Sequence, residues 1–233
     1  MIYLSDSEFI GNDLVFSSNV GSLVAFNSNI TFTGYATFVN NTPSQTDSGD
    51  FQEGGAITLF QSNVFFDGEC NLEHNYAVNG GAMHSTESKH YVNGKLTIAH
   101  NTATGHGGGV YLSTSELNCQ QKSILVLWNN TASHKGGGLH AISSSIKAVS
   151  SIAWRQYTGA RINITGNAAE RGGGLSLEAN AKLFILKYDD IYNDFSTTTF
   201  TTNSADYGGA IHVDDNTNSG TCTSSTETEC FFH

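Results

Sequence analysis

The chain contains almost no proline and unusually little charge. Pro43 is its single proline, so nearly every backbone N–H is available for sheet hydrogen bonds. Charged residues make up 13% of the sequence, about half the usual share. Only 10 residues are basic and 21 are acidic, for a net charge of −11. This balance argues against nucleic acids and anionic membranes as partners, because both require basic patches.

Membrane-spanning and secretory segments are also missing from the printed sequence. No stretch is long and apolar enough to span a bilayer, and residues 1–7 lack the basic start and apolar core of a signal peptide. Met1 enters in the middle of a repeat unit. We therefore expect a piece of a longer array, and we predict no membrane insertion of this piece.

Cysteine is scarce as well, with four residues in the chain. Cys222 and Cys230 lie in a Ser/Thr/Glu-rich tail, residues 214–233, where we expect a disulfide-closed loop; two free thiols are the alternative. Cys70 follows an inward alternation and is predicted to be a small buried hydrophobe. Cys119 belongs to a different part of the repeat and is not its obvious partner.

Glycine, by contrast, is abundant and periodic. Six times a glycine pair precedes a small and then an aliphatic residue, and five of these copies follow an Asn-x-Ala triplet. The pairs begin at Gly54, Gly80, Gly107, Gly136, Gly172 and Gly208. Two upstream copies align when Gly21 is set against Gly55 and Met1 against Ala56, which makes about eight units. Self-similarity at such a period indicates an array of stacked units.

Each unit alternates with period two after its glycines, which is typical of a strand with one buried face. The first inward column is Ile2, Leu23, Ile57, Met83, Val110, Leu139, Leu175 and Ile211. The second is Leu4, Ala25, Leu59, Ser85, Leu112, Ala141, Leu177 and Val213, in which Ser85 is the polar exception. The outward column between them is Tyr3, Val24, Thr58, His84, Tyr111, His140, Ser176 and His212.

A third inward column ends each unit three residues before an asparagine. Its members are Phe38, Leu72, Ile98, Leu127, Ile164 and Phe200, and the asparagines are Asn41, Asn75, Asn101, Asn130, Asn167 and Asn203. We predict that each asparagine occupies a tight left-handed bend and stacks into an amide ladder. We predict that the glycines have positive φ or lie where coils approach too closely for a Cβ.

These columns predict an all-β fold, a right-handed parallel β-helix (β-solenoid) of about eight coils over residues 1–213. As a fragment of an array, it is expected to be open at both ends. The rival fold is a β-sandwich with hairpins at Asn79-Gly80 and Asn93-Gly94. A sandwich, however, gives no reason for one motif to recur in register.

The glycine motif alternates with a second tetrapeptide, Phe-x-x-Asn, over nearly the whole chain. It occurs at Phe9–Asn12, Phe16–Asn19, Phe26–Asn29, Phe38–Asn41, Phe60–Asn63 and Phe200–Asn203. The alternation resembles the repeats of the polymorphic outer membrane protein family, and similar repeats occur in large eukaryotic extracellular proteins. The resemblance implies a parallel β-helix passenger, secreted or displayed at a surface and often adhesive. It transfers no catalytic residues, because the motif is structural.

Side chains with binding chemistry are few. Tyr111, His84 and His140 in the outward column are weak binding candidates. Trp154 and Tyr157, in an insertion, are two more, although hydrophobic cover for that loop explains them equally well. We expect no metal, because His84, His140 and His212 fall in alternate coils about 9.6 Å apart. We expect no cofactor, because the glycine run before Val110 lacks the Lys-Ser/Thr of a phosphate loop.

The expected function is that of an extracellular or cell-surface structural or adhesive module without catalytic activity. Its expected partners are glycans or cell-surface proteins, together with end-to-end self-association. The alternative is a carbohydrate-active β-helix enzyme, a polysaccharide lyase or glycoside hydrolase, that uses an acidic cluster. The insertion with Asp189, Asp190 and Asp194 is the first candidate cluster, for which a solvated acidic loop is the simpler explanation. A weaker cluster is formed by Asp206, Asp214 and Asp215.

Overall fold

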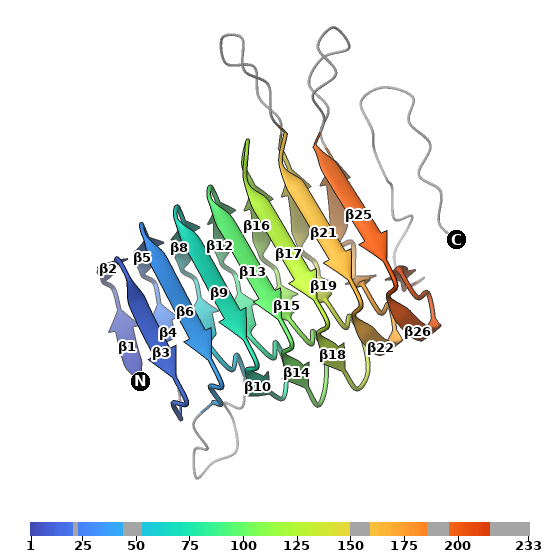
Figure 1. Cartoon of the computed structure of the whole chain (residues 1–233), viewed down its shortest axis with the longest axis horizontal. Coiled ribbons are helices and arrows are strands. Elements are labelled where there is room, and N and C mark those ends of the chain that lie inside the picture. The colour runs from blue at the N-terminus through green and yellow to red at the C-terminus, as the bar shows by residue number, and fades with distance from the viewer. Residues whose placement is uncertain (21–22, 44–52, 150–158, 186–195, 215–233) are drawn as a thin grey trace, which may run out of the picture.

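The computed structural model describes residues 1–20, 23–43, 53–149, 159–185 and 196–214. These residues form strands joined by turns and include no helix, hence none that could cross a membrane. The strands succeed one another coil by coil from the N-terminal end of the stack to its C-terminal end (Figure 1). Every strand pairing among them is parallel, which is the arrangement predicted for a β-solenoid.

Four parallel sheets run along the stack. The first sheet contains β1 (Ile2–Ser5), β4 (Leu23–Phe26), β7 (Ile57–Phe60), β11 (Met83–Thr86), β15 (Val110–Ser113), β19 (Leu139–Ile142), β23 (Leu175–Glu178) and β27 (Ile211–Val213). The second contains β2 (Glu8–Gly11), β5 (Asn29–Phe32), β8 (Asn63–Phe66), β12 (Lys89–Val92), β16 (Glu116–Cys119), β20 (Ser145–Ala148) and β24 (Lys182–Ile185). The third contains β3 (Leu14–Ser17), β6 (Tyr35–Val39), β9 (Glu69–Glu73), β13 (Lys95–Ala99), β17 (Ile124–Trp128), β21 (Arg161–Thr165) and β25 (Thr197–Thr201). A short fourth sheet contains β10 (Tyr76–Ala77), β14 (Thr102–Ala103), β18 (Thr131–Ala132), β22 (Ala168–Arg171) and β26 (Ser204–Tyr207).

The register of the first sheet confirms the predicted columns. Met83 pairs with Ile57 on one side and with Val110 on the other, and the same alignment runs from Ile2 to Ile211. The prediction of a parallel β-helix of about eight coils is therefore confirmed, since the first sheet has eight strands. The β-sandwich alternative is wrong, because Asn79-Gly80 and Asn93-Gly94 join strands of different parallel sheets rather than hairpins.

The core is a column of apolar side chains between the sheets. Its largest fully buried members include Phe32, Phe38 and Phe66, and the rings of Phe32 and Phe66 stack with centroids 5.7 Å apart. Cys70 is buried as predicted, and Cys119 is buried too; both thiols are free. Burial raises the pKa of both thiols, that of Cys119 to about 12, so they act as apolar side chains.

Ser85, the polar exception in the second inward column, has a buried partner. Its Oγ lies 2.7 Å from Nε2 of His90, and Nδ1 of His90 lies 2.8 Å from the carbonyl oxygen of Glu116. Both nitrogens of this fully buried ring are therefore hydrogen-bonded inside the core. Burial nevertheless lowers the pKa of His90 to about 4, against the raising effect of the hydrogen bond to Glu116.

An amide ladder follows the third sheet, as predicted. In each coil the side-chain oxygen of the asparagine accepts bonds from the backbone and side-chain N–H groups of the asparagine one coil earlier, at 2.8–3.1 Å from Asn19 through to Asn203. The side-chain nitrogen of Asn101 also donates to the carbonyl of Leu72. The prediction that these asparagines adopt the left-handed conformation is wrong. That conformation belongs to the residue before each one, such as His74 or His100, which turns the following amide inward.

A second ladder lies at the corner between the first and second sheets. The backbone N–H of a serine in one coil donates to the hydroxyl of the serine in the next, at 2.9–3.1 Å, through Ser7, Ser28, Ser62, Ser88, Ser115 and Ser144. Each hydroxyl in turn donates to the carbonyl two residues earlier, as Ser62 does to Phe60. These serines satisfy backbone groups that a corner would otherwise leave buried without partners.

The glycine pairs fill both predicted roles, positive φ at the first residue and close approach of coils at the second. The first glycine of each pair has φ of 61–66°, and the second, in every pair but the last, lies where consecutive coils touch. A Cβ built on Gly137, for example, would overlap the carbonyl oxygens of Ala168 and Gly173. The pair thus makes a left-handed turn and then passes its neighbour at backbone contact distance.

Candidate functional site

The predicted outward column lies in register on the outer face of the first sheet, yet its middle is covered. Tyr3 in the first coil is 58% exposed, whereas His84 is 3%, His140 is 1% and Ser176 is 0% exposed. A strand that only bounds a solenoid would leave this face open to solvent. Another part of the chain must therefore cover the outer face of the first sheet from the third coil onward.

The cover is the residue directly before each of the first five glycine pairs, which we call the covering strip: Glu53, Asn79, His106, Lys135 and Arg171. Parallel bridges join Glu53 to Asn79 and Lys135 to Arg171 between coils. The hydroxyl of Thr58 donates to the carbonyl of Glu53 at 2.8 Å, which ties the strip to the sheet. The left-handed glycine that follows each strip residue allows the chain to fold back over its own strand.

Beneath the strip, aromatic and imidazole rings form a row. His84 stacks on Tyr111 with centroids 4.9 Å apart and an interplanar angle of 10°. Tyr111 in turn contacts His140 at 5.4 Å, and His106 of the strip stacks against His140 at 5.0 Å. The structure thus brings together three predicted binding candidates, Tyr111, His84 and His140, and buries two of them.

Ion pairs join the strip to this row and to the ends of two strands. Oε2 of Glu53 lies 2.5 Å from Nε2 of His84. Burial raises the pKa of Glu53, but the hydrogen bond and the charge of His84 outweigh it, and the net shift is downward. Lys135 contacts Glu178 and also Asp214, the latter at 3.2 Å. Burial lowers the pKa of Lys135, but the two carboxylates outweigh this effect and raise it.

Several buried polar atoms of this face have no hydrogen-bond partner within the described residues. They are Nδ1 of His84, His106 and His140, Oγ of Ser176 and Nε2 of His212. Burial, together with the charges of His106, Lys135 and His212, lowers the pKa of His140 to about 3. Burial and the nearby His134 likewise lower the pKa of His106. His106 and His140 are therefore neutral imidazoles at physiological pH.

This row does not form a metal site. Within the described ranges no group of three or more His, Cys, Asp or Glu side chains is placed to hold a metal ion. Stacked rings direct their nitrogens alongside one another rather than toward a common point, whereas zinc needs ligands converging at about 2 Å. His74 and His100, in adjacent coils, also stack, with ring centroids 4.9 Å apart and an interplanar angle of 4°.

The remaining residues that the sequence analysis singled out lie outside this row of rings. Asp206 is exposed on β26, apart from the ion pairs described above, while Asp214 contacts Lys135. Predictions that lie outside the described residues concern Trp154, Tyr157, Asp189, Asp190, Asp194, Asp215, Cys222 and Cys230. Sequence reasoning missed His106, Lys135 and Glu178. Aligning the position before each glycine pair would have shown that His106 and Lys135 occupy equivalent places in the repeat.

Comparisons of the chain with protein-family models, with curated proteins and with solved structures found no match. The resemblance to the polymorphic outer membrane protein repeats accordingly stays a prediction from its motifs.

Proposed function

We propose that this chain is a structural and adhesive β-solenoid module, secreted or displayed at a cell surface, without catalytic activity. The observation that carries the proposal is the unbroken asparagine ladder from Asn19 to Asn203. It joins seven successive coils, and the serine ladder joins six at another corner. Hydrogen-bonded ladders of this kind stiffen the solenoid into a rod, which can act as a spacer that presents a binding surface away from its point of attachment.

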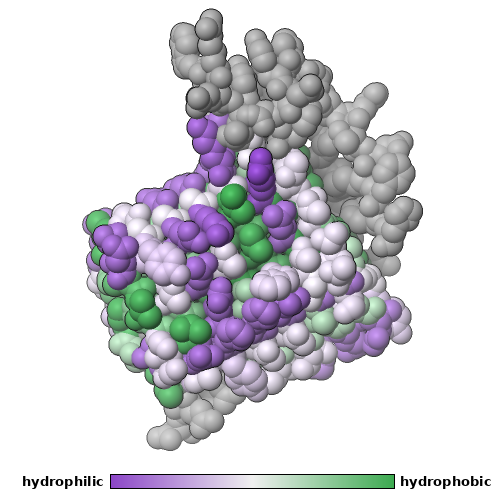
Figure 2. Space-filling model, in the orientation of Figure 1, coloured by the Kyte–Doolittle hydropathy of each residue, from purple (hydrophilic) through white to green (hydrophobic). Residues whose placement is uncertain are grey.

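The outer face of the third sheet suits a polar partner. Its central outward positions are mostly threonine and asparagine, namely Thr37, Asn71, Thr97, Asn163 and Thr199, with Val15 and Val126 as exceptions. Figure 2 shows this face as hydrophilic side chains with small apolar patches between them. Such a surface offers hydrogen-bond donors and acceptors to glycans or to cell-surface proteins. The serine- and threonine-rich composition and the motif resemblance support a location outside the cell.

Charged side chains on the sheets form ion pairs between adjacent coils. Lys95 of β13 contacts Glu69 of β9 at 2.8 Å, and Lys147 of β20 contacts Glu116 of β16 at 3.2 Å. Each pair joins strands that neighbour each other in one sheet. This pairing supports a structural use of charge.

One cluster favours the second candidate, a carbohydrate-active enzyme. Glu178 and Asp214 both contact the ammonium group of Lys135, so the two carboxylates are neighbours. Retaining glycosidases hold their two carboxyl groups about 5–5.5 Å apart. Here, however, both carboxylates are partners of one lysine whose pKa they raise, which is the arrangement of a structural ion pair.

Incubation with acidic and neutral polysaccharides tests both candidates. New reducing ends and unsaturated products are measured, and binding of the immobilised chain to glycans and to whole cells is measured in parallel. We expect binding without product. Product formation that is lost in Glu178→Gln or in Asp190→Asn would replace the structural proposal by the enzymatic one.

A further inference from the structure

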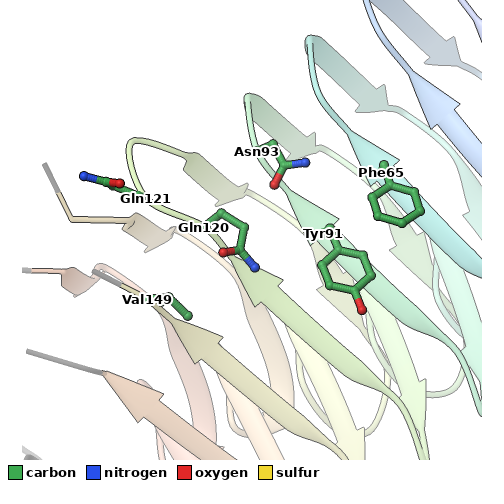
Figure 3. A pocket seen from close by; sticks show the side chains of 6 residues that line it. All are labelled: Phe65, Tyr91, Asn93, Gln120, Gln121 and Val149. Atoms are coloured by element: carbon green, nitrogen blue, oxygen red, sulfur yellow. The ribbon is translucent and has the colours of Figure 1, made fainter. Parts of the chain in front are cut away.

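A shallow hollow of about 390 Å³ lies on the outside of the second sheet, at its corner with the third. It is separate from the row under the covering strip, which belongs to the first sheet. Six residues from four successive coils and their corners line it (Figure 3): Phe65, Tyr91, Asn93, Gln120, Gln121 and Val149.

The hollow results from a step in side-chain size along the second sheet. In register, the outward position changes from Phe65 and Tyr91 to the shorter Asn118. The corner after β16 is also longer, with four residues between β16 and β17 where two separate β12 from β13. The extra residues place Gln120 and Gln121 at the rim.

Two stacked rings form the apolar side of the hollow. Phe65 and Tyr91 lie with centroids 4.8 Å apart and an interplanar angle of 7°. Both rings are only half-buried, so apolar aromatic surface is left in contact with solvent. Rings held by each other in this way present a preorganised surface that loses little conformational entropy on binding.

Amides form the polar side. Asn93 donates from Nδ2 to Oδ1 of Asp67 at 2.6 Å, which holds its side chain in place. Figure 3 shows the Asn93 oxygen and the Gln120 amide turned toward the space beside Tyr91. An amide carries both donors and an acceptor, so it can bond a hydroxyl in either sense. None of the six lining residues is charged.

The geometry points to a short neutral oligosaccharide as the ligand of this hollow. A sugar ring has one face of C–H groups, which packs on aromatic rings, and an edge of hydroxyls, which bonds to amides. An uncharged lining on a chain of net charge −11 does not favour phosphate or a uronic acid. A purely apolar ligand would offer no hydrogen bond to the Asn93 oxygen or to the Gln120 amide, and a folded protein needs an interface of about 1,000 Å² or more. The inference rests on the proposed adhesive role and names the partner's chemistry.

Calorimetric titration of the whole chain tests this inference with three probes. They are a tetramer of N-acetylglucosamine, a tetramer of β-1,4-linked glucose and a tetramer of galacturonate. We expect saturable, weak binding of a neutral tetramer, with Kd on the order of 1 mM, because the contact area is small. Tyr91→Ala should weaken it about tenfold or more, and Gln120→Ala should weaken it less.

Tyr76→Ala is the matched control, since Tyr76 is a partly exposed tyrosine on the short fourth sheet. It should bind as the unmodified chain does, and thermal unfolding should show that all variants are folded. The inference is overturned if no neutral tetramer binds, if galacturonate binds more tightly, or if Tyr91→Ala binds unchanged.

Adhesion of the same variants to cells separates this inference from the proposed function. If Tyr91→Ala loses saccharide binding and adhesion together, both stand. If it adheres normally and still binds the neutral tetramer, the hollow is not the site, although the module remains adhesive. If the unmodified chain binds a neutral tetramer through Tyr91 but adheres to nothing, the hollow stands and the adhesive role fails.

Discussion

A single polar position shows how closely each residue is tied to the one stacked on it. Ser85 occupies a column of apolar residues and is tolerated because His90 lies at hydrogen-bond distance from its hydroxyl. His90 in turn reaches a backbone carbonyl of the next coil. The serine and the histidine are thus one feature, and neither is explained alone.

Stability should fall in acid because of this buried imidazole. The folded pKa of His90 is about 4 and the unfolded one about 6.5. Above pH 6.5 both states are neutral at this ring; as pH falls from about 6.5 to about 4, only the unfolded chain gains the proton. The free energy of unfolding should therefore drop by roughly 3 kcal/mol from this group over that window. His140, with a pKa of about 3, acts in the same direction.

Urea unfolding at a series of pH values measures the effect. His90→Gln should be less stable at neutral pH but should lose less stability between pH 6.5 and 4. Thr97→Ser, on the outer face of the third sheet, changes no titratable group; it is the control and should leave the slope unchanged. A slope that is identical in His90→Gln and the unmodified chain would contradict the prediction.

The glycine pair is the element that spaces the coils. Its first member makes the left-handed turn, and its second passes the carbonyl groups of the neighbouring coil without a side chain. The last described coil provides a natural comparison. A Cβ on Gly209 would have no described atom nearer than the Asn203 oxygen at 3.2 Å, whereas one on Gly137 would overlap two carbonyl oxygens.

Gly137→Ala should consequently destabilise the chain by about 1–3 kcal/mol or more, since coils must move apart to admit the methyl group. Gly209→Ala, at the same motif position, should change the free energy of unfolding by less than about 1 kcal/mol. Chemical denaturation followed by circular dichroism compares the two. Equal effects would show that coil spacing is not what the second glycine provides.

The whole molecule is a stack whose first and last described coils pair on one side only. β1 pairs with β4, and β27 pairs with β23. Leu14, which faces inward, is only partly buried against the core in the first coil. Its neighbour Val15 faces outward and is 69% exposed. Among the described residues, the first coil thus has an unpaired edge and a partly exposed core cross-section, which favour pairing with another chain.

We therefore expect the 233-residue chain to self-associate end to end as its concentration rises. Leu14→Lys should weaken the association, because it places a charge on the end of the stack, while Val15→Lys on the side face should not. Analytical ultracentrifugation of the three proteins reads this out. A monomer at all concentrations, or equal effects of both substitutions, would refute end-to-end pairing.

The sequence by itself determined the architecture and its register. A strand has a side-chain period of two, so aligning the glycine motif placed all the inward columns correctly, and the asparagine ladder followed from one asparagine per unit. The sequence pattern assigned the left-handed conformation to the asparagine itself, whereas the residue before it adopts that conformation. Repetition shows which residues share a corner, but the backbone of the corner depends on which side chain must turn inward.

Only the tertiary structure decided what lies over the outer faces. Lys135 meets Glu178 and Asp214, which are 43 and 79 residues further along the chain, because later coils stack beside it. The covering strip buries His84 and His140, although period two assigns them to the outside. The hollow beside Tyr91 exists because neighbouring coils differ in side-chain size and corner length. Repeat periodicity specifies the side of the sheet, whereas burial depends on contacts between units, and each unit differs from the next.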